Sequence, residues 1–267
     1  MALFAAVREL DGTIRERTIR LRPRAPQATA GGAAGGEWIV IARTHLLLTI
    51  LCLAVSGGRA AAEPVHDGQL WINTTLFGSI GDAAFFAEVQ PRFGNGISQL
   101  DQSILRPAVG WKVNEDLKLY QGYASVEDHG TSGRVGVEDR SFQEIDWKIG
   151  EISGVKVSSR TRFEQRRQST GRNVGFRLRE SLRFAMPLTQ EKGSVSAVGW
   201  TEIFVALNDT AWGARAGFDR IRTFVGLELP IGGKSTVEIG YMNQTARTPA
   251  SGVELDHILS LNLFVRY

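Results

Sequence analysis

The segment at residues 155–166 most strongly limits what this chain can fold into, because charged and uncharged side chains alternate along it. Successive side chains of a β-strand point to opposite faces, so the alternation predicts a strand with two different faces. One face carries Val155, Val157, Ser159, Thr161 and Phe163, and the other carries Lys156, Arg160, Arg162, Glu164 and Arg166. Such a strand separates an apolar environment from a charged one.

The same period of two recurs through residues 63–267 in segments of roughly ten residues, and no helical periodicity of useful length interrupts it. We count eleven such segments, at 70–78, 84–93, 104–113, 117–126, 140–149, 155–166, 174–188, 194–207, 218–229, 236–244 and 257–267. The pattern predicts an all-β fold, namely an antiparallel up-and-down transmembrane β-barrel with a charged lumen, as a single domain over 63–267.

The connections between the segments alternate in length, as they do in outer-membrane barrels with short periplasmic turns and longer outer loops. Short turns fall at 114–116, 150–154, 189–193 and 230–234, and longer ones at 94–101, 127–138, 208–217 and 246–255. Bacterial single-chain barrels have an even number of strands. We therefore expect about twelve strands, with one hidden at 127–138, or ten if 70–78 is not a full barrel strand.

Aromatic residues near the segment ends are typical of the two interfacial girdles of a membrane barrel. They are Trp71, Trp111, Trp147, Trp200, Trp212, Tyr120, Tyr123 and Tyr241.

The charged face should point into the lumen, because an arginine at the midplane of the lipid face costs about 2–4 kcal/mol. In the lumen each arginine needs a carboxylate partner. The predicted lumen-lining network is Arg92, Arg106, Glu144, Arg160, Arg162, Glu164, Arg166, Arg177, Arg179, Arg183, Glu202, Arg220, Arg222 and Glu228. Two interpretations stay open: the network fills and stiffens a narrow barrel, or it forms a charged constriction that accepts a small anionic solute.

The last segment predicts how the barrel is assembled. Its apolar positions Leu259, Leu261, Leu263 and Val265 alternate with polar ones and lead to the terminal Tyr267. A closing strand with an aromatic last residue resembles the signal that the barrel-assembly machinery reads in Gram-negative bacteria. Expected partners are therefore this machinery and outer-membrane lipid, with the oligomeric state left open.

The first 62 residues predict export. Residues 39–62 combine a charged residue, a short apolar run and a small-x-small site, which indicates a secretory signal peptide cleaved before Glu63. The apolar run is too short for a spanning helix, and its context does not suit lipidation of Cys52. Residues 1–38 are either a disordered extension or the result of a start codon placed too far upstream of a true start near Val40.

Net charge argues against nucleic-acid binding. Residues 1–62 hold eight arginines and four acidic residues, so the remaining chain has 31 − 8 = 23 basic and 28 − 4 = 24 acidic residues, a net charge of −1. The only cysteine of the whole chain, Cys52, lies within residues 1–62. The exported part can therefore form no disulfide and no cysteine-ligated metal site.

Catalytic and cofactor motifs are absent from the exported sequence. His257 lies near Asp256 and Ser260, but three residues along a strand place Ser260 on the other face. We therefore predict no catalytic residues, cofactor or metal, and a protein that is not an enzyme.

Several sequence blocks carry a family resemblance, among them 90–93, 138–143, 160–166, 201–210, 239–244 and 257–267. In this order they resemble the DUF2490 family of uncharacterised proteobacterial proteins, over essentially all of 69–267. The chain departs at Ser141-Phe142, where the family often has a tryptophan one residue before a glutamine pair. The resemblance implies an outer-membrane barrel and carries over no activity.

The sequence favours an outer-membrane barrel of a Gram-negative bacterium, acting as a narrow pore or as a structural envelope component. Two alternatives come from other classes. An outer-membrane lipid-modifying hydrolase would need a serine and a histidine within about 3 Å. A soluble periplasmic β-barrel binding a small molecule would have an apolar interior and a polar exterior.

Overall fold

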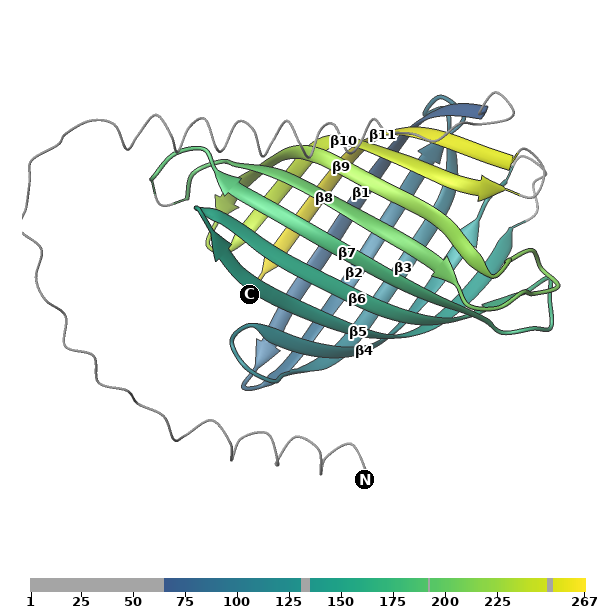
Figure 1. The fold of residues 1–267 in the computed structure, drawn as a ribbon, viewed down its shortest axis with the longest axis horizontal. Helices are drawn as coiled ribbons and strands as arrows, with labels where there is room; N and C mark the ends of the chain where they lie inside the picture. The colour runs from purple at the N-terminus through teal and green to yellow at the C-terminus, as the bar shows by residue number, and fades with distance from the viewer. Residues whose placement is uncertain (1–64, 131–134, 192, 249–251) are drawn as a thin grey trace, which may run out of the picture. The chain divides into compact units, whose positions relative to one another are not determined.

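The described part of the chain forms eleven β-strands that close into one barrel (Figure 1). The computed structural model describes residues 65–130, 135–191, 193–248 and 252–267. The expected extension at 1–38 and signal peptide at 39–62 lie outside these described residues. No helix in the described ranges is long and apolar enough to cross a membrane.

Each of the eleven sequence segments corresponds to one strand, which confirms the all-β fold. The strands are β1 (Val65–Ile80), β2 (Ala83–Gly94), β3 (Gln99–Lys112), β4 (Leu117–Asp128), β5 (Gly136–Ile152), β6 (Val155–Gln168), β7 (Gly175–Pro187), β8 (Ser196–Ala206), β9 (Gly217–Gly232), β10 (Ser235–Thr248) and β11 (Gly252–Arg266).

The barrel closes through a parallel pair of strands, and the expectation of twelve strands, with ten as the second choice, is wrong. β1 pairs with β11 in the same direction, from Val65 opposite Glu254 to Phe77 opposite Arg266. The other neighbouring strands pair antiparallel. An odd number of alternating strands leaves the first and last running the same way, so the strictly antiparallel up-and-down arrangement fails at this one seam.

The connections divide between two ends of the barrel. The end that we call the turn end carries connections 81–82, 113–116, 153–154, 188–195 and 233–234, and the loop end carries 95–98, 129–135, 169–174, 207–216 and 249–251. The loop expected at 246–255 is shorter than predicted because β10 and β11 extend into it. β1 starts at the loop end, whereas β11 finishes at the turn end, where the Tyr267 amide donates to the Phe77 carbonyl (3.1 Å).

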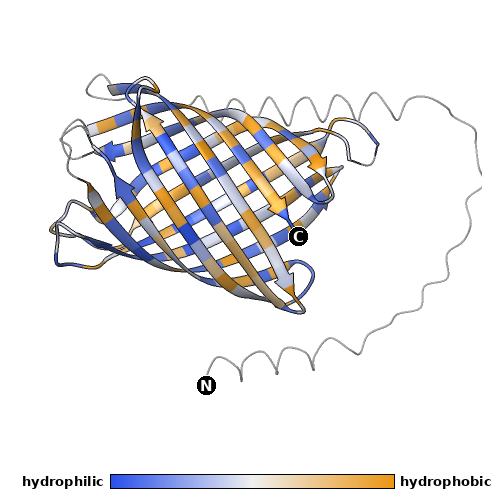
Figure 2. Cartoon of the chain, turned by 180° about the vertical axis from the view of Figure 1, so that it is seen from behind, coloured by the Kyte–Doolittle hydropathy of each residue, from blue (hydrophilic) through white to orange (hydrophobic). Residues whose placement is uncertain are grey.

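Inside and outside positions alternate along the barrel wall, and Figure 2 shows the resulting chequered pattern of polar and apolar residues. On β2, Ala84, Phe86 and Glu88 are buried inside the barrel, while Phe85 and Val89 are exposed outside. The alternation follows from the pleat of the strand, which turns successive side chains to opposite faces.

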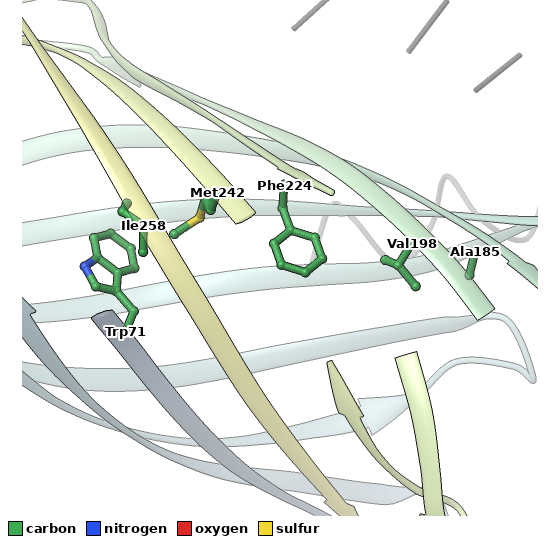
Figure 3. Close-up of a cluster of buried hydrophobic side chains, with 6 residues drawn as sticks. All are labelled: Trp71, Ala185, Val198, Phe224, Met242 and Ile258. Atoms are coloured by element: carbon green, nitrogen blue, oxygen red, sulfur yellow. The ribbon is translucent and has the colours of Figure 1, made fainter. Parts of the chain in front are cut away.

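Two apolar clusters line opposite stretches of the inner wall. The Phe224 cluster consists of Trp71, Ala185, Val198, Phe224, Met242 and Ile258, from β1 and β7–β11 (Figure 3). The Phe142 cluster consists of Ala84, Phe86, Ala108, Tyr120, Ala124 and Phe142, from β2–β5. Full burial of a phenylalanine contributes about 1.5–3 kcal/mol, and both Phe224 and Phe142 are 0% exposed.

Glycines make room for the ring of Phe224. Gly226 on β9 lies opposite Gly240 on β10. A Cβ atom added to Gly240 would lie 2.7 Å from Phe224 Cζ and 2.6 Å from Gly226 Cα. Only glycine leaves the two strands and the ring this close, because every other residue carries that atom.

We expect Gly240→Val to lower the free energy of unfolding by about 1–3 kcal/mol, as overpacking of a filled core does. The clash includes backbone atoms, so a side-chain rotation cannot relieve it. The unfolding midpoint in detergent measures the effect. Gly68→Val is the control, because an added Cβ at Gly68 meets nothing within 4 Å. Equal midpoints for the two variants would contradict this account of the close packing.

Candidate functional site in the barrel lumen

The barrel encloses a polar cavity of about 690 Å³ that is lined by residues from both ends. Asp116, Lys148 and Arg266 reach it from the turn end, and Asp128 and Glu254 from the loop end. Twelve of the fourteen residues predicted for the charged network line this cavity: Arg92, Arg106, Glu144, Arg160, Arg162, Arg166, Arg177, Arg179, Arg183, Glu202, Arg220 and Arg222. Glu164 and Glu228 join the network through the arginines that they accept from.

The strand register creates many of the ion pairs directly. Residues opposite each other on antiparallel strands point to the same face and lie about 4.5–5.5 Å apart at their Cβ atoms. Opposite charges therefore meet across neighbouring strands, as Glu88 with Arg106, Glu144 with Arg162, Glu164 with Arg177 and Glu202 with Arg222. The first three of these pairs are hydrogen-bonded.

Two glutamates hold the centre of the network together. Glu164 accepts from Arg177 Nη2 (2.6 Å) and from Arg179 Nη1 (2.7 Å). Glu202 Oε1 accepts from Arg179 Nη2 (2.8 Å) and from Arg160 Nη2 (2.9 Å). Arg179 thus links the two carboxylates, and side chains from β6, β7 and β8 become one unit.

Two pairs of like charges that lie opposite each other share a third group. At the turn end, Glu228 and Glu238 face each other, and Arg183 Nη2 donates to both, at 2.7 and 2.6 Å. Towards the loop end, Arg140 and Arg166 face each other, and both donate to Glu138. The sharing removes the repulsion that two unpaired like charges would produce.

The network is buried, so its members depend on one another. Arg162, Glu164 and Glu202 are 2%, 1% and 2% exposed. Removing such charges from water costs several kcal/mol per ion, and only close partners offset this cost. The buried ring of Phe204 adds a cation–π partner, with the Cζ atoms of Arg179 and Arg222 4.5 and 4.6 Å from its centroid.

Arg92 differs from the arginines at the centre. It donates to the amide oxygens of Gln102 (2.7 Å) and Gln90 (2.8 Å), and its guanidinium stacks on Trp71, 3.7 Å from the ring centroid. No carboxylate among the described residues lies within 4.0 Å of it. Its partners are therefore neutral.

Residues of the predicted assembly signal lie along the outside of β11. Ser260 and Asn262 are buried in the lumen at 3% and 8% exposure, while Leu259 is 47% exposed. Leu261, Leu263 and Val265 share the outward parity of Leu259. Tyr267 follows the strand and is fully exposed. The role of these residues in assembly stays a prediction.

Sequence reasoning missed several members of the network. Glu138 was assigned to the connection 127–138, but it lies on β5, two residues before Arg140 and on the same face. Extending the period of two by one step would have found it. Glu238 has no charged neighbours on its face of β10, so the sequence pattern does not indicate that this face belongs to the charged network. Asp219 lies at a β-bulge in the β8–β9 pairing, where the alternation breaks and Asp219 reaches Arg177 (3.0 Å).

The interfacial assignment was wrong for three of the eight aromatic residues, Trp71, Tyr120 and Trp200, because they lie on the lumen side of the wall. Trp111, Trp147, Tyr123 and Tyr241 are exposed on the outside, at 46–57%. Trp71 and Tyr120 are buried in the lumen clusters, Trp200 packs on the Phe224 cluster, and Trp212 lies in the connection 207–216. Hydrophobic character alone cannot tell the two sides apart, since strand parity decides the side.

Histidine and serine residues are separated by the wall. His257 lies on the outside and stacks on His66. Its Nδ1 atom is hydrogen-bonded to the Tyr241 hydroxyl (2.7 Å). Ser260 faces the lumen. Within the described ranges, no group of three or more His, Cys, Asp or Glu side chains could hold a metal ion.

We expect Glu202→Ala to lower the free energy of unfolding by about 3–5 kcal/mol, because Arg160, Arg179 and Arg222 then lose a shared carboxylate inside the barrel. Arg162→Ala should act in the same direction, because it removes the hydrogen-bonded partner of Glu144 and leaves that carboxylate only Arg160 at 4.0 Å. The unfolding midpoint in detergent measures both. Arg215→Ala is the control, since this loop side chain is 61% exposed and its pair with Asp209 spans 4.0 Å. A midpoint for Glu202→Ala equal to that of Arg215→Ala would disprove the buried network.

Comparison with known proteins identifies the family. Residues 68–254 match the model of a protein family of unknown function, DUF2490. An uncharacterised protein of Methylorubrum extorquens is 79% identical over 228 residues, which cover 85% of this chain and 100% of that relative. No solved structure matches the chain. The chain therefore belongs to the DUF2490 family.

Proposed function

We propose that the protein is an integral outer-membrane β-barrel with a narrow, charge-lined pore. The observation that carries this proposal is the polarity of the wall, with arginines and glutamates inside and large apolar side chains exposed outside. The exposed set comes from β1–β5 and β7–β11 and includes Leu76, Phe85, Val89, Leu105, Val109, Leu119, Ile145, Leu178, Ile203, Phe218, Leu227, Ile239 and Leu259. A soluble barrel has the opposite polarity.

A polar patch on β4–β7 departs from this apolar character of the outer face. Glu180 on β7 is exposed and accepts from the hydroxyls of Ser159 (2.7 Å) and Thr161. Nearby strands carry a ladder in which Gln165 donates to Gln143 (2.9 Å) and Gln143 to Gln121 (2.7 Å). Because each group has a partner on the wall, its transfer to lipid costs less than that of a free polar group.

The cavity supports a narrow pore rather than a wide one. Residues at both ends line the same space, and small barrels leave little room beyond their side chains. Rings of arginine favour anions in pores. A purely structural envelope role is the second candidate, and the density of buried ion pairs favours it.

Fractionation of cells that express residues 40–267 tests the location. We expect the protein in the outer membrane as a detergent-resistant band that shifts on SDS gels after boiling. Conductance of the purified barrel in planar bilayers then separates a pore from a structural component. A soluble periplasmic product would overturn the membrane proposal and redirect attention to a small-molecule ligand.

Cysteine labelling tests the orientation that the odd strand number implies. We expect Arg215→Cys, in a loop-end connection, and Gly68→Cys, near the start of β1, to react with an impermeant maleimide on intact cells. Lys234→Cys, in a turn-end connection, should react only after permeabilisation, because short turns face the periplasm in such barrels. Cysteines introduced here would be alone in the barrel, since Cys52 lies before it.

The comparison between Gly68→Cys and Lys234→Cys is the decisive one. Equal labelling of these two positions on intact cells would contradict a barrel in which β1 starts at one face of the membrane and β11 finishes at the other.

A further inference from the structure

We propose that the lumen contains a binding site for a small oxyanion of the carboxylate or phosphate class, built on Arg92, Trp71 and Arg222. This site adds a ligand class to the proposed function. It rests on that proposal only because a solute must be able to reach the lumen. Three independent features of the lumen lead to it: uncompensated charge, unpartnered donors and a rigid mounting of the guanidinium groups.

The first feature is charge. Among the described residues, Arg92 donates hydrogen bonds only to the neutral amides of Gln90 and Gln102. Arg222 donates Nε to Gln244 (2.7 Å), and its nearest carboxylate contact is Glu202 at 3.9 Å. Glu202 is shared with Arg160 and Arg179, which are closer to it. Two guanidinium groups next to Trp71 therefore lack a close negative partner, which is costly in a buried place unless an anion binds.

The second feature is a set of donors without acceptors. Arg92 Nε, Arg160 Nε, Arg220 Nε and Arg162 Nη1 are buried and make no hydrogen bond. All four arginines line the cavity. A buried donor that stays unpartnered costs about 1–3 kcal/mol, and of these four donors Arg92 Nε belongs to the proposed site. An oxyanion supplies acceptors and negative charge together.

The third feature is the mounting of the two guanidinium groups. The Cζ atoms of Arg92 and Arg222 lie 3.7 and 4.8 Å from the centroid of the Trp71 ring. Trp71 is itself fixed, since its Nε1 donates to Gln69 (2.8 Å). Stacking holds a guanidinium by its face and fixes the direction of its N–H groups, which here donate to neutral amides that an oxyanion can replace or join as acceptor.

The β2–β3 pairing shifts register between Arg92 and Phe93. Bulges of this kind re-aim side chains and occur near functional sites. Asp101 and Gln102 both line the cavity at this bulge although they are neighbours in sequence.

Acidic groups lie on the loop side of the site and limit what it accepts. Asp101, Glu254 and Asp256 line the same cavity. Asp256 Oδ2 accepts from Gln244 (2.6 Å), which in turn accepts from Arg222, so this carboxylate positions the site through one amide. Asp256 Oδ1 has no partner. A bulky or highly charged anion would meet these carboxylates, which favours a small anion.

Calorimetry on the purified full barrel tests the proposal, with sodium phosphate and sodium acetate as probes and sodium chloride at equal ionic strength as the reference. We expect saturable binding of one anion per barrel for phosphate, acetate or both, and the two arms separate phosphate from carboxylate selectivity. Arg92→Met should weaken binding at least about tenfold, because it removes charge-assisted hydrogen bonds.

Arg266→Gln is the matched control. Arg266 also lines the cavity and also lacks a carboxylate within 4.0 Å among the described residues, but it lies at the turn end and bonds to Thr236 (3.0 Å). Binding by this variant should match that of the unchanged protein. An equal loss in Arg92→Met and Arg266→Gln, or no saturable binding of either probe, would overturn the site.

The unfolding midpoint gives a second readout that a merely structural role for Arg92 would not produce. Without anion, Arg92→Met should be at least as stable as the unchanged protein, because it removes an uncompensated buried charge, and phosphate should no longer raise its midpoint. A large loss of stability without anion would overturn the site. Since neither readout uses conductance, a barrel that binds anion but conducts no current would refute the pore and leave the site standing.

Discussion

A charged side chain enclosed by a β-barrel is shielded from water by the wall, so it needs a partner of opposite charge inside the barrel. Along its own strand only every second residue points inward, so most partners lie on neighbouring strands. This constraint organises the lumen. Glu144 meets Arg162 and Glu164 meets Arg177 because the register places them opposite each other. A slip of one residue would turn the whole arginine face of β6 outward. The ion pairs therefore specify the register of the wall as well as filling its interior.

The period of two in the sequence was enough to locate all eleven strands, since each strand buries one parity of residues. The number twelve came from outside the sequence, from the rule that bacterial barrels have even counts. The structure closes instead by pairing β1 with β11 in parallel. Segment ends were less well predicted, because β5 begins at Gly136 inside a polar stretch. Polar residues such as Glu138 look like a loop in sequence when they face a polar lumen.

Strand parity assigned the charged residues to one face, but it could not say which carboxylate each arginine contacts. The contacts follow from the register between strands, and the sequence gives no register. Local breaks in alternation are also invisible in advance. Asp219 and Asp101 lie at bulges, so two consecutive residues reach the lumen where a regular strand would send only one. The inward position of Trp71 has a different origin, since the regular parity of β1 places it beside Arg92 instead of at an interface.

The centre of the lumen and the Trp71 region differ in how their arginines are paired. At the centre, Arg179 bridges Glu164 and Glu202, so this part acts as a rigid frame. Frames of this kind hold neighbouring groups in place at no further cost when a ligand arrives. Arg92 and Arg222 are attached to that frame through an aromatic ring and neutral amides, with their charge left over. The central arginines are thus paired closely with carboxylates, whereas Arg92 and Arg222 are left to neutral amides, so positive charge remains beside Trp71.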